Sequence, residues 1–353
     1  MKYMISMVAV LGLAACQSTN RLPEMPLKPT ATHSQTSSPA ITDRGTDLLS
    51  RGDVQRFIQN EARKGHYSRA QLESFFSNVA YKPGILDVMD KPGTSQPWYT
   101  FWANNASSNR VSRGNAFMQQ NAAILQAVSD RYGVPVELIT AIVGIETNYG
   151  TSMGSYRVAD ALTTLGFHYP RRADYFQQEL GQFLQLAYEE KQDPMSFKGS
   201  FAGAMGMPQF MPSSWRQWAV DWDGDGHRDI WRNVGDTAAS VANYMKQHGW
   251  RSGQPVAVPV ALNITPQLQA AIDEKTALKY SAGQLRSLGV VIPERVSNGE
   301  KGVLYRLESS PGIYEYWFGL NNFYAIWQYN HSRLYVAAVR QIANGVNNGA
   351  ANL

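Results

Sequence analysis

The sequence has 353 residues, of which 44% are hydrophobic and 17% are charged, and it contains 9 tryptophans. This composition excludes a disordered protein, and the length predicts two or three domains around a sizeable core. The formal net charge of +4 is mildly basic, and no run of lysine and arginine marks a nucleic-acid contact. The chain also has no glycine-rich phosphate loop, which argues against nucleotide chemistry. An acidic polymer is compatible with the charge.

The N-terminus is typical of an exported lipoprotein. Residues 1–15 predict a signal peptide, with an apolar segment too short to span a bilayer. Leu13–Cys16 resembles the bacterial lipobox, so Cys16 is the expected lipid anchor, and a chance cysteine is the alternative. Residues 16–46 are rich in Ser, Thr and Pro and predict a disordered tether. Because Gln17 follows the cysteine, we expect the periplasmic face of the outer membrane in a Gram-negative bacterium.

Residues 47–118 predict a domain of short amphipathic helices. Asp53 is expected to cap one helix, and Ser68 with Gln71 forms a capping box for the next. The aromatic segment 97–102, which includes Phe101, is more typical of a core than of a site. A further helix is expected over residues 113–131, with Gly133 ending it.

The next helix carries the strongest candidate for a catalytic residue. Pro135 suits its first turn, and Gly150 suits the point where the chain leaves it. At helical spacing, Glu146 falls between two rows of apolar residues, and the opposite face is small enough for close packing. Burial is expected to raise the pKa of this carboxyl, as a general acid near neutral pH requires. A structural glutamate in a buried ion pair is the alternative.

Helical spacing continues over residues 156–165 and 173–189, and the segment of about 157–195 is expected to join the N-terminal helical domain. The loop between these helices contains Arg171 and Arg172, and two adjacent arginines usually mark a solvated turn. Residues 199–212 are mostly small and almost uncharged. Such a composition lets the backbone approach a ligand or another segment closely.

An acidic segment then matches most of an EF-hand calcium loop, with Gly226 at the sharp bend. The candidate Ca²⁺ ligands are Asp221, Asp223, Asp225, His227 through its backbone carbonyl, and Asp236. Arg232 stands where such a loop normally has its last glutamate, so we expect Asp236 to close a lengthened loop over 221–236 and to cap the helix 237–248. A solvated acidic turn is the alternative.

From residue 252 to residue 317, short β-type runs separated by Pro, Gly and Asn predict a small inserted β domain. Helical spacing returns at Asn322 and continues to about Ala343. It is broken at residues 329–332, where polar side chains stand near a helix start. The expected fold is therefore mainly α, with one small sheet.

Five motifs carry a family resemblance: Gly144–Thr147, Ala202–Gly206, Gln209–Ser214, Asp221–His227 and Tyr329–Ser332. In order and spacing they resemble the family 3 lytic transglycosylases, glycoside hydrolase family 103, over about residues 47–346. The resemblance implies a lysozyme-like catalytic core formed by residues 119–251 and 318–353. It also implies cleavage of the β-1,4 bond between N-acetylmuramic acid and N-acetylglucosamine in peptidoglycan, which leaves a 1,6-anhydromuramic acid end. Glycan strands are the implied partner, and the cell-wall synthesis machinery is a further candidate.

The resemblance also implies roles for single residues, with Glu146 as the catalytic acid. The positions that match substrate contacts are Ser200, Gln209, Tyr244, Tyr329, Asn330, Tyr335, Tyr175, Arg171, Arg172 and Phe101. Arg171 and Arg172 match the pair that meets anionic peptide stems, and Phe101 stands where the family usually has a tyrosine. Ca²⁺ is expected to serve stability rather than chemistry, and no organic cofactor is expected.

The absence of a second carboxylate near the candidate site residues agrees with this chemistry. Ordinary glycosidases place two carboxylates across the scissile bond, but the segments around Ser200, Gln209 and Asn330 contain none. If the C6 hydroxyl of the substrate attacks, Glu146 can act first as acid and then as base. Two alternatives stay open: a hydrolytic muramidase with Asp160 or Asp174 as second carboxylate, and a peptidoglycan-binding lipoprotein without turnover.

Overall fold

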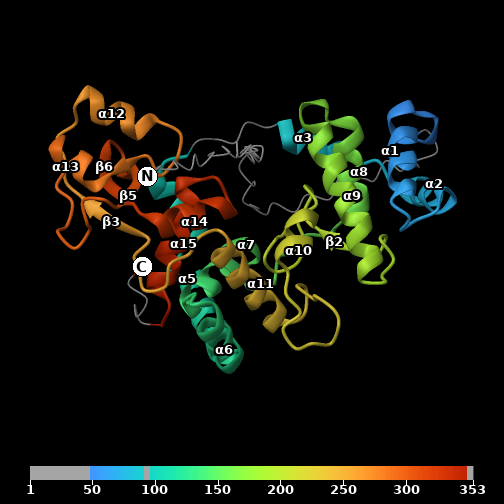
Figure 1. The fold of residues 1–353 in the computed structure, drawn as a ribbon, viewed down its shortest axis with the longest axis horizontal. Helices are drawn as coiled ribbons and strands as arrows, with labels where there is room; N and C mark the ends of the chain where they lie inside the picture. The colour runs from blue at the N-terminus through green and yellow to red at the C-terminus, as the bar shows by residue number, and fades with distance from the viewer. Residues whose placement is uncertain (1–47, 91–95, 348–352) are drawn as a thin grey trace, which may run out of the picture.

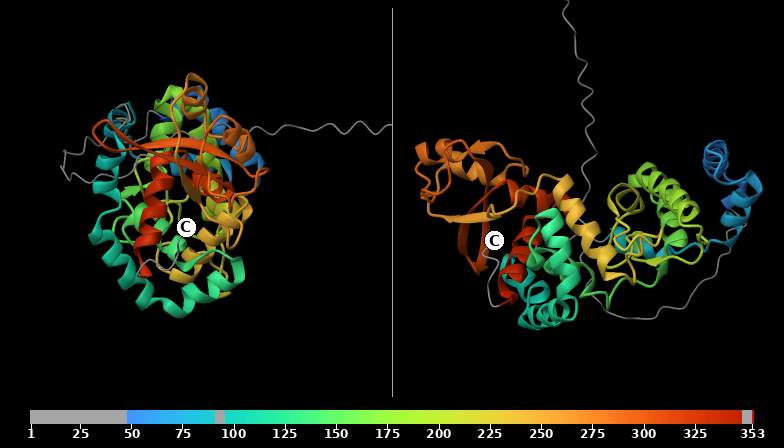
Figure 2. Two further views of the ribbon diagram at one scale, coloured as in Figure 1. Left: turned by 90° about the vertical axis from the view of Figure 1, so that its left-hand side faces the viewer. Right: turned by 60° about the horizontal axis from the view of Figure 1, so that its bottom comes forward.

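The structure is a computed structural model that describes residues 48–90, 96–347 and 353. The predicted signal peptide, tether and lipidation site at Cys16 lie outside these residues. Three groups of elements follow one another along the longest axis of the molecule: a helical group, a central helical core and a small mixed α/β group (Figures 1 and 2). In the part of the chain that the structure describes, no helix is long and apolar enough to cross a bilayer.

The helical group contains a 3-10 turn (η1, Leu48–Ser50) and the helices α1 (Gly52–Arg63), α2 (Arg69–Asn78), α3 (Pro83–Asp90), α8 (Val158–His168) and α9 (Ala173–Glu189). Phe57, Phe76 and Phe167 pack edge to face in its core. The capping box of Ser68 and Gln71 is confirmed. The cap predicted at Asp53 is wrong, because Arg51 holds the N-cap position and its guanidinium binds the Asp53 carboxylate.

The central core is built around α7 (Val136–Thr147), which confirms the predicted helix. Its residues from Leu138 to Ile145 are all buried, because α5 (Ser108–Gln120), α6 (Ala122–Tyr132), α11 (Val234–Gln247) and α15 (Arg333–Gly345) pack around it. The helix predicted over 113–131 is two helices, since the backbone of Asn121 leaves helical geometry at φ −121° and ψ 22°. Gly133 ends α6 in the left-handed conformation, as predicted.

Shorter elements connect the groups. They are α4 (Trp98–Asn105), the 3-10 turn η2 (Pro170–Arg172), α10 (Pro212–Trp218), α14 (Asn321–Tyr329) and a two-stranded antiparallel pair of β1 (Tyr156–Arg157) and β2 (Lys198–Gly199). The break predicted at residues 329–332 is confirmed. It lies between α14 and α15, where the Ser332 side chain accepts a hydrogen bond from the Tyr335 N–H.

The third group contains the predicted sheet. Its strands are β3 (Ala257–Val260), β4 (Tyr280–Ser281), β5 (Lys301–Ser310) and β6 (Ile313–Gly319), in the antiparallel order β3-β6-β5-β4. Two helices that the sequence patterns did not predict, α12 (Pro266–Asp273) and α13 (Ala282–Ser287), cover it. Both are too short for helical periodicity to show. Their apolar residues form a hydrophobic cluster of their own with Val258, Leu304 and Phe318 of the sheet. Other strand residues, among them Val303 and Tyr305, belong to the main hydrophobic core.

Candidate active site

Helix α7 ends directly after the predicted catalytic residue. Glu146 is followed by Thr147, the last helical residue, and then by Asn148 at φ 49° and Tyr149 at φ 61°, both left-handed. The chain therefore leaves the helix two residues before Gly150, where the sequence placed the departure. Glu146 itself is half-buried, unlike its fully buried helical neighbours. The predicted rise of its pKa stays a prediction.

Three buried tyrosines from three helices surround this carboxylate. The Tyr335 hydroxyl donates a hydrogen bond to Glu146 Oε1 at 2.8 Å. Tyr329 stacks with Tyr335 at 6.4 Å between ring centroids and meets Tyr244 edge on at 4.8 Å. The other two hydroxyls hold backbone: Tyr244 donates to the Gln328 carbonyl at 2.7 Å, and Tyr329 donates to the Pro208 carbonyl at 2.5 Å. The structure thus brings four of the predicted site residues together.

The electrostatics of this cluster keep the tyrosines neutral. Burial, and after it the negative charge of Glu146, raises the pKa of Tyr335 and of Tyr329 well above the ordinary value. The same two causes raise the pKa of Tyr244. The Tyr335 hydroxyl therefore stays protonated and remains a hydrogen-bond donor to Glu146 at every pH at which the protein works.

The small-residue segment after β2 packs against the end of α7, which confirms the expected close approach. The Thr147 hydroxyl donates to the Met207 carbonyl at 2.9 Å. Gly206 has φ 65°, and a Cβ there would lie 2.6 Å from Ile230. Gln209 is also left-handed, at φ 52°, and its side-chain amide donates to the Gly206 carbonyl at 3.0 Å. Gln209 is therefore held rigidly in the segment that contacts α7.

Three other predicted contact residues have separate surroundings. The Ser200 hydroxyl oxygen accepts from the Ala204 N–H at 3.0 Å, which fixes its own turn. Asn330 is buried at the end of α14, and among the described residues its Oδ1 has no hydrogen-bond partner. Phe101 is buried and stacks on Trp98 in the core. Glycan contacts for these three stay predictions.

The two adjacent arginines point to different partners. Arg171 is exposed and forms an ion pair with Asp90 at 3.3 Å. The Arg172 guanidinium lies over the Tyr175 ring, 4.3 Å from its centroid, where burial lowers the Arg172 pKa. Tyr175 and Arg172 form one unit beside α9, while Arg171 remains on the surface. Their contact with peptide stems stays a prediction.

The two candidate second carboxylates differ in their surroundings. Asp160 is buried in α8, where it accepts hydrogen bonds from the Arg157 guanidinium at 2.7 Å and from the Ala80 N–H at 2.9 Å. These bonds tie α8 to the end of α2, so Asp160 is a structural residue. Asp174 is exposed in the first turn of α9. The muramidase alternative with Asp160 is therefore wrong.

The acidic loop brings three of its predicted ligands together. Carboxylate oxygens of Asp221, Asp223 and Asp236 lie within 4.8 Å of one another. Asp225 is exposed, and its carboxylate accepts from the His227 N–H at 2.8 Å. The His227 ring lies 3.0 Å from a Glu190 carboxylate oxygen, which raises the His227 pKa. A set of three hard oxygen donors fits Ca²⁺.

The predicted helix cap at Asp236 is wrong. Asn233 stands at the N-cap of α11, and its side chain accepts from the Gly235 and Asp236 N–H groups. The Asp236 carboxylate turns back into the loop and accepts from the Trp222 N–H at 2.8 Å and the Asp229 N–H at 2.7 Å. Asp236 therefore closes the lengthened loop as expected.

Two residues near Glu146 were missed by the sequence patterns. Arg110 on α5 donates to the Gly144 carbonyl at 3.2 Å and to the Ile145 carbonyl at 3.3 Å, so it holds the last turn of α7. Tyr149 donates from its hydroxyl to the Arg110 carbonyl at 2.8 Å. Tyr149 stands three residues after Glu146 in the sequence, but nothing local signals Arg110.

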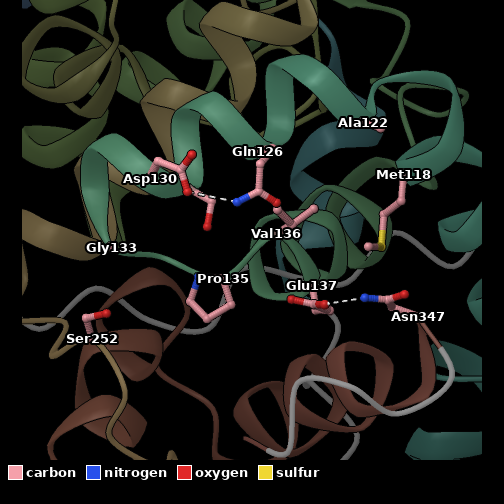
Figure 3. A pocket seen from close by; sticks show the side chains of 11 residues that line it. Met118, Ala122, Gln126, Asp130, Gly133, Pro135, Val136, Glu137, Ser252 and Asn347 are labelled. Carbon is pink, nitrogen blue, oxygen red and sulfur yellow. Dashed lines mark hydrogen bonds between the residues drawn. The ribbon is translucent and has the colours of Figure 1, made fainter.

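A cavity of about 580 Å³ lies at the opposite end of α7 (Figure 3). Its carboxylates are already paired, because Asp130 accepts from Gln126 and Glu137 accepts from Asn347, both at 2.8 Å. Glu137 is nine residues from Glu146, or about 14 Å along a helix. This cavity is therefore separate from the tyrosine cluster.

Comparison with known proteins agrees with this geometry. The sequence model of the transglycosylase SLT domain matches residues 50–344. Membrane-bound lytic murein transglycosylase B of Escherichia coli (strain K12) is 39% identical over 365 residues, covering 98% of this chain and 97% of the relative.

Solved structures are similar as well. Soluble lytic transglycosylase SltB1 of Pseudomonas aeruginosa is 41% identical with a TM-score of 0.80, covering 84% of this chain and 99% of that one. Escherichia coli Slt35 in complex with calcium is 40% identical with a TM-score of 0.77, covering 86% of this chain and 96% of that one.

The lysozyme-like helical core, with one glutamate at a helix end among buried tyrosines, defines a lytic transglycosylase. The chain belongs to the transglycosylase SLT domain family and is a lytic murein transglycosylase.

Proposed function

We propose that this enzyme cleaves the β-1,4 bond between N-acetylmuramic acid and N-acetylglucosamine in peptidoglycan strands and leaves a 1,6-anhydromuramic acid end. Glu146 is the acid and then the base. The observation that carries the proposal is the hydrogen bond from Tyr335 to Glu146, which fixes a single half-buried carboxylate at the end of α7. Asp160 is occupied by structural bonds and cannot serve as a partner carboxylate.

The reaction needs one group that gives a proton to the leaving oxygen and then takes another from the C6 hydroxyl. Protonated Glu146 donates to the glycosidic oxygen as the bond to C1 of the muramic acid breaks. The resulting carboxylate removes the proton of the C6 hydroxyl while O6 bonds to C1, so Glu146 ends protonated and water is not consumed. Tyr335 stays a donor throughout and stabilises the carboxylate between the two steps.

The acidic loop is proposed to hold a structural Ca²⁺. Asp221, Asp223 and Asp236 supply the carboxylate cluster, while Asp225 and the His227 carbonyl complete the set. Burial, and after it the negative charges of Asp223 and Asp221, raises the pKa of Asp236. The ion would screen the repulsion among these carboxylates. It would thus stabilise the loop that follows α10 and take no part in the reaction.

The domain division and location are proposed from the sequence together with the fold. We divide the chain into a signal peptide (1–15), a tether (16–46), a helical domain (47–96 with about 157–195), a catalytic core (97–156, 196–251 and 318–353) and an α/β insertion (252–317). The boundary predicted at residue 118 moves to about residue 96, because α5 packs on α7 and α4 packs on α15. The separate hydrophobic cluster of the insertion supports this division. Lipidation at Cys16 would hold the enzyme on the periplasmic face of the outer membrane, within reach of glycan strands and the cell-wall synthesis machinery.

Exchange of Glu146 for Gln tests the proposal. Glu146→Gln keeps the shape of the side chain and removes the transferable proton, so turnover should fall by at least about 10³-fold while glycan binding persists. Mass spectrometry of digested sacculi should show anhydro ends for the wild type. Asp174→Asn is the control and should leave the anhydro product dominant. Reducing ends from the wild type would instead establish a hydrolase.

A further inference from the structure

The last turn of α7 is held from outside by a half-buried arginine. Arg110 reaches from α5 and donates from one guanidinium nitrogen to the Gly144 and Ile145 carbonyls, at 3.2 and 3.3 Å. The Gly144 carbonyl also accepts from the Asn148 N–H at 2.9 Å, whereas the Ile145 carbonyl is one of the last carbonyl groups, which a helix leaves without an internal partner. The residue that follows these two carbonyls is Glu146. Arg110 therefore bonds to the backbone from which the reacting carboxylate projects.

Arg110 is in turn held by Tyr149, on the other side of the same helix end. The Tyr149 hydroxyl donates to the Arg110 carbonyl at 2.8 Å. Its hydroxyl oxygen fills the space beside two glycines: a Cβ would lie 2.5 Å from it at Gly144 and 2.6 Å from it at Gly114. The ring also packs on Phe117, with 5.5 Å between centroids. The glycines of α5 and α7 thus leave room for the Tyr149 side chain.

The backbone at this point is strained, which shows how firmly the contact is held. Tyr149 has φ 61° directly after Asn148 at φ 49°, and neither is a glycine. A non-glycine residue in this region costs on the order of 1 kcal/mol and persists only where the surroundings enforce it. Such strain is typical of positions that orient a functional group. Here it turns the chain sharply after Glu146 and directs Tyr149 back between α5 and α7.

We propose that Arg110 and Tyr149 form a clamp that positions Glu146 for its two proton transfers. The inference rests on the proposed role of Glu146 and assigns two further residues to the reaction as positioning residues. A displacement of about 1 Å at a reacting group can cost on the order of 100-fold in rate. The clamp fixes the last turn of α7, and it also places a positive charge at the negative end of the helix dipole. That charge favours the carboxylate that must act as base.

Three variants and a control test the clamp by kcat, KM, melting temperature and pH profile, with peptidoglycan glycan oligomers as substrate. Tyr335, Tyr329 and Tyr244, from α15, α14 and α11, also face Glu146, and all three stay neutral. Removing the cation with Arg110→Gln should therefore lower kcat by about tenfold or more with KM nearly unchanged. It should also move the alkaline limb of the profile to higher pH, because Glu146 must start protonated and its carboxylate form loses a stabilising cation.

The conservative variants separate charge from contact. Arg110→Lys keeps the cation, so the alkaline limb should stay in place. Its kcat should fall by several-fold, because an ammonium replaces the planar group whose Nη1 bonds both carbonyls. Tyr149→Phe keeps the ring between the glycines and loses only the bond to the Arg110 carbonyl, so kcat should fall and KM should not. Arg113→Gln is the matched control, because Arg113 is an exposed cation on α5. It should retain wild-type kcat.

Several results would overturn the clamp. Arg110→Gln with wild-type kcat and an unmoved pH profile would do so, as would an equal loss in Arg113→Gln. If Arg110→Gln does not fold, Tyr149→Phe decides, and wild-type kcat in that variant rejects the proposal. The proposed function is tested by a different measurement, because it depends on which product the wild type forms. The clamp depends on the ratio of variant to wild-type rates, for whichever product forms.

Discussion

Replacing Tyr335 with phenylalanine removes one hydrogen bond from the reacting carboxylate and little else. The ring is buried beside Tyr329, so Phe keeps the packing, and the lost contact is the 2.8 Å bond to Glu146 Oε1. A hydrogen bond to a charged group contributes about 1.5–3 kcal/mol. If that contribution is lost at the transition state, kcat should fall by about 10- to 150-fold.

Stability should respond much less to Tyr335→Phe. Glu146 is half-buried, so water can replace the lost donor, and the free energy of unfolding should fall by less than about 1.5 kcal/mol. The alkaline limb of the pH profile should move to higher pH, because the lost bond favoured the ionised carboxyl and Glu146 must start protonated. Urea unfolding and initial rates on glycan oligomers measure these quantities on the same preparation.

Tyr244→Phe is the matched control for this prediction. Its hydroxyl donates to the Gln328 carbonyl and not to Glu146, so its removal should lower stability by about 1 kcal/mol and leave the pH profile in place. If Tyr335→Phe kept more than half of wild-type kcat, or if Tyr244→Phe moved the pH profile equally, the reasoning from the Tyr335 bond would be refuted.

Three further predictions concern stability. Ca²⁺ at a hundredfold excess over its Kd should stabilise the fold by about 2.7 kcal/mol, and Asp223→Asn should blunt the rise in melting temperature that calcium produces and a chelator reverses. Gly114→Ala should cost about 1–3 kcal/mol in urea unfolding, because the new Cβ would lie 2.6 Å from Tyr149 Oη, whereas Gly84→Ala meets nothing within 4 Å and should cost nothing. Burial raises the pKa of Glu179; the folded state therefore binds its proton more tightly than the unfolded state, and stability relative to Glu179→Gln should fall as pH rises from about 4 to 7. A pH-independent difference between those two proteins would contradict this last prediction.

The sequence by itself determined the features that depend on neighbours along the chain. The capping box at Ser68, the helix that carries Glu146 and the carboxylate spacing of the acidic loop all follow from residues a few positions apart. Local geometry fixes these features, because a helix or a turn sets which side chains share a face. Where prediction and structure differ in such features, their bounds differ by only a few residues: α7 ends at Asn148 rather than at Gly150.

Only the tertiary structure decided what surrounds the carboxylate. Tyr335 is 189 residues from Glu146, and Arg110 is 34 residues from Gly144, so their contacts depend on how α5, α7 and α15 pack. A buried tyrosine that donates to a catalytic group has the same local pattern as one that fills a core. Likewise, the role of Asp160 follows from a backbone N–H 80 residues away. These pairings arise from helix packing, which periodicity along the chain does not specify.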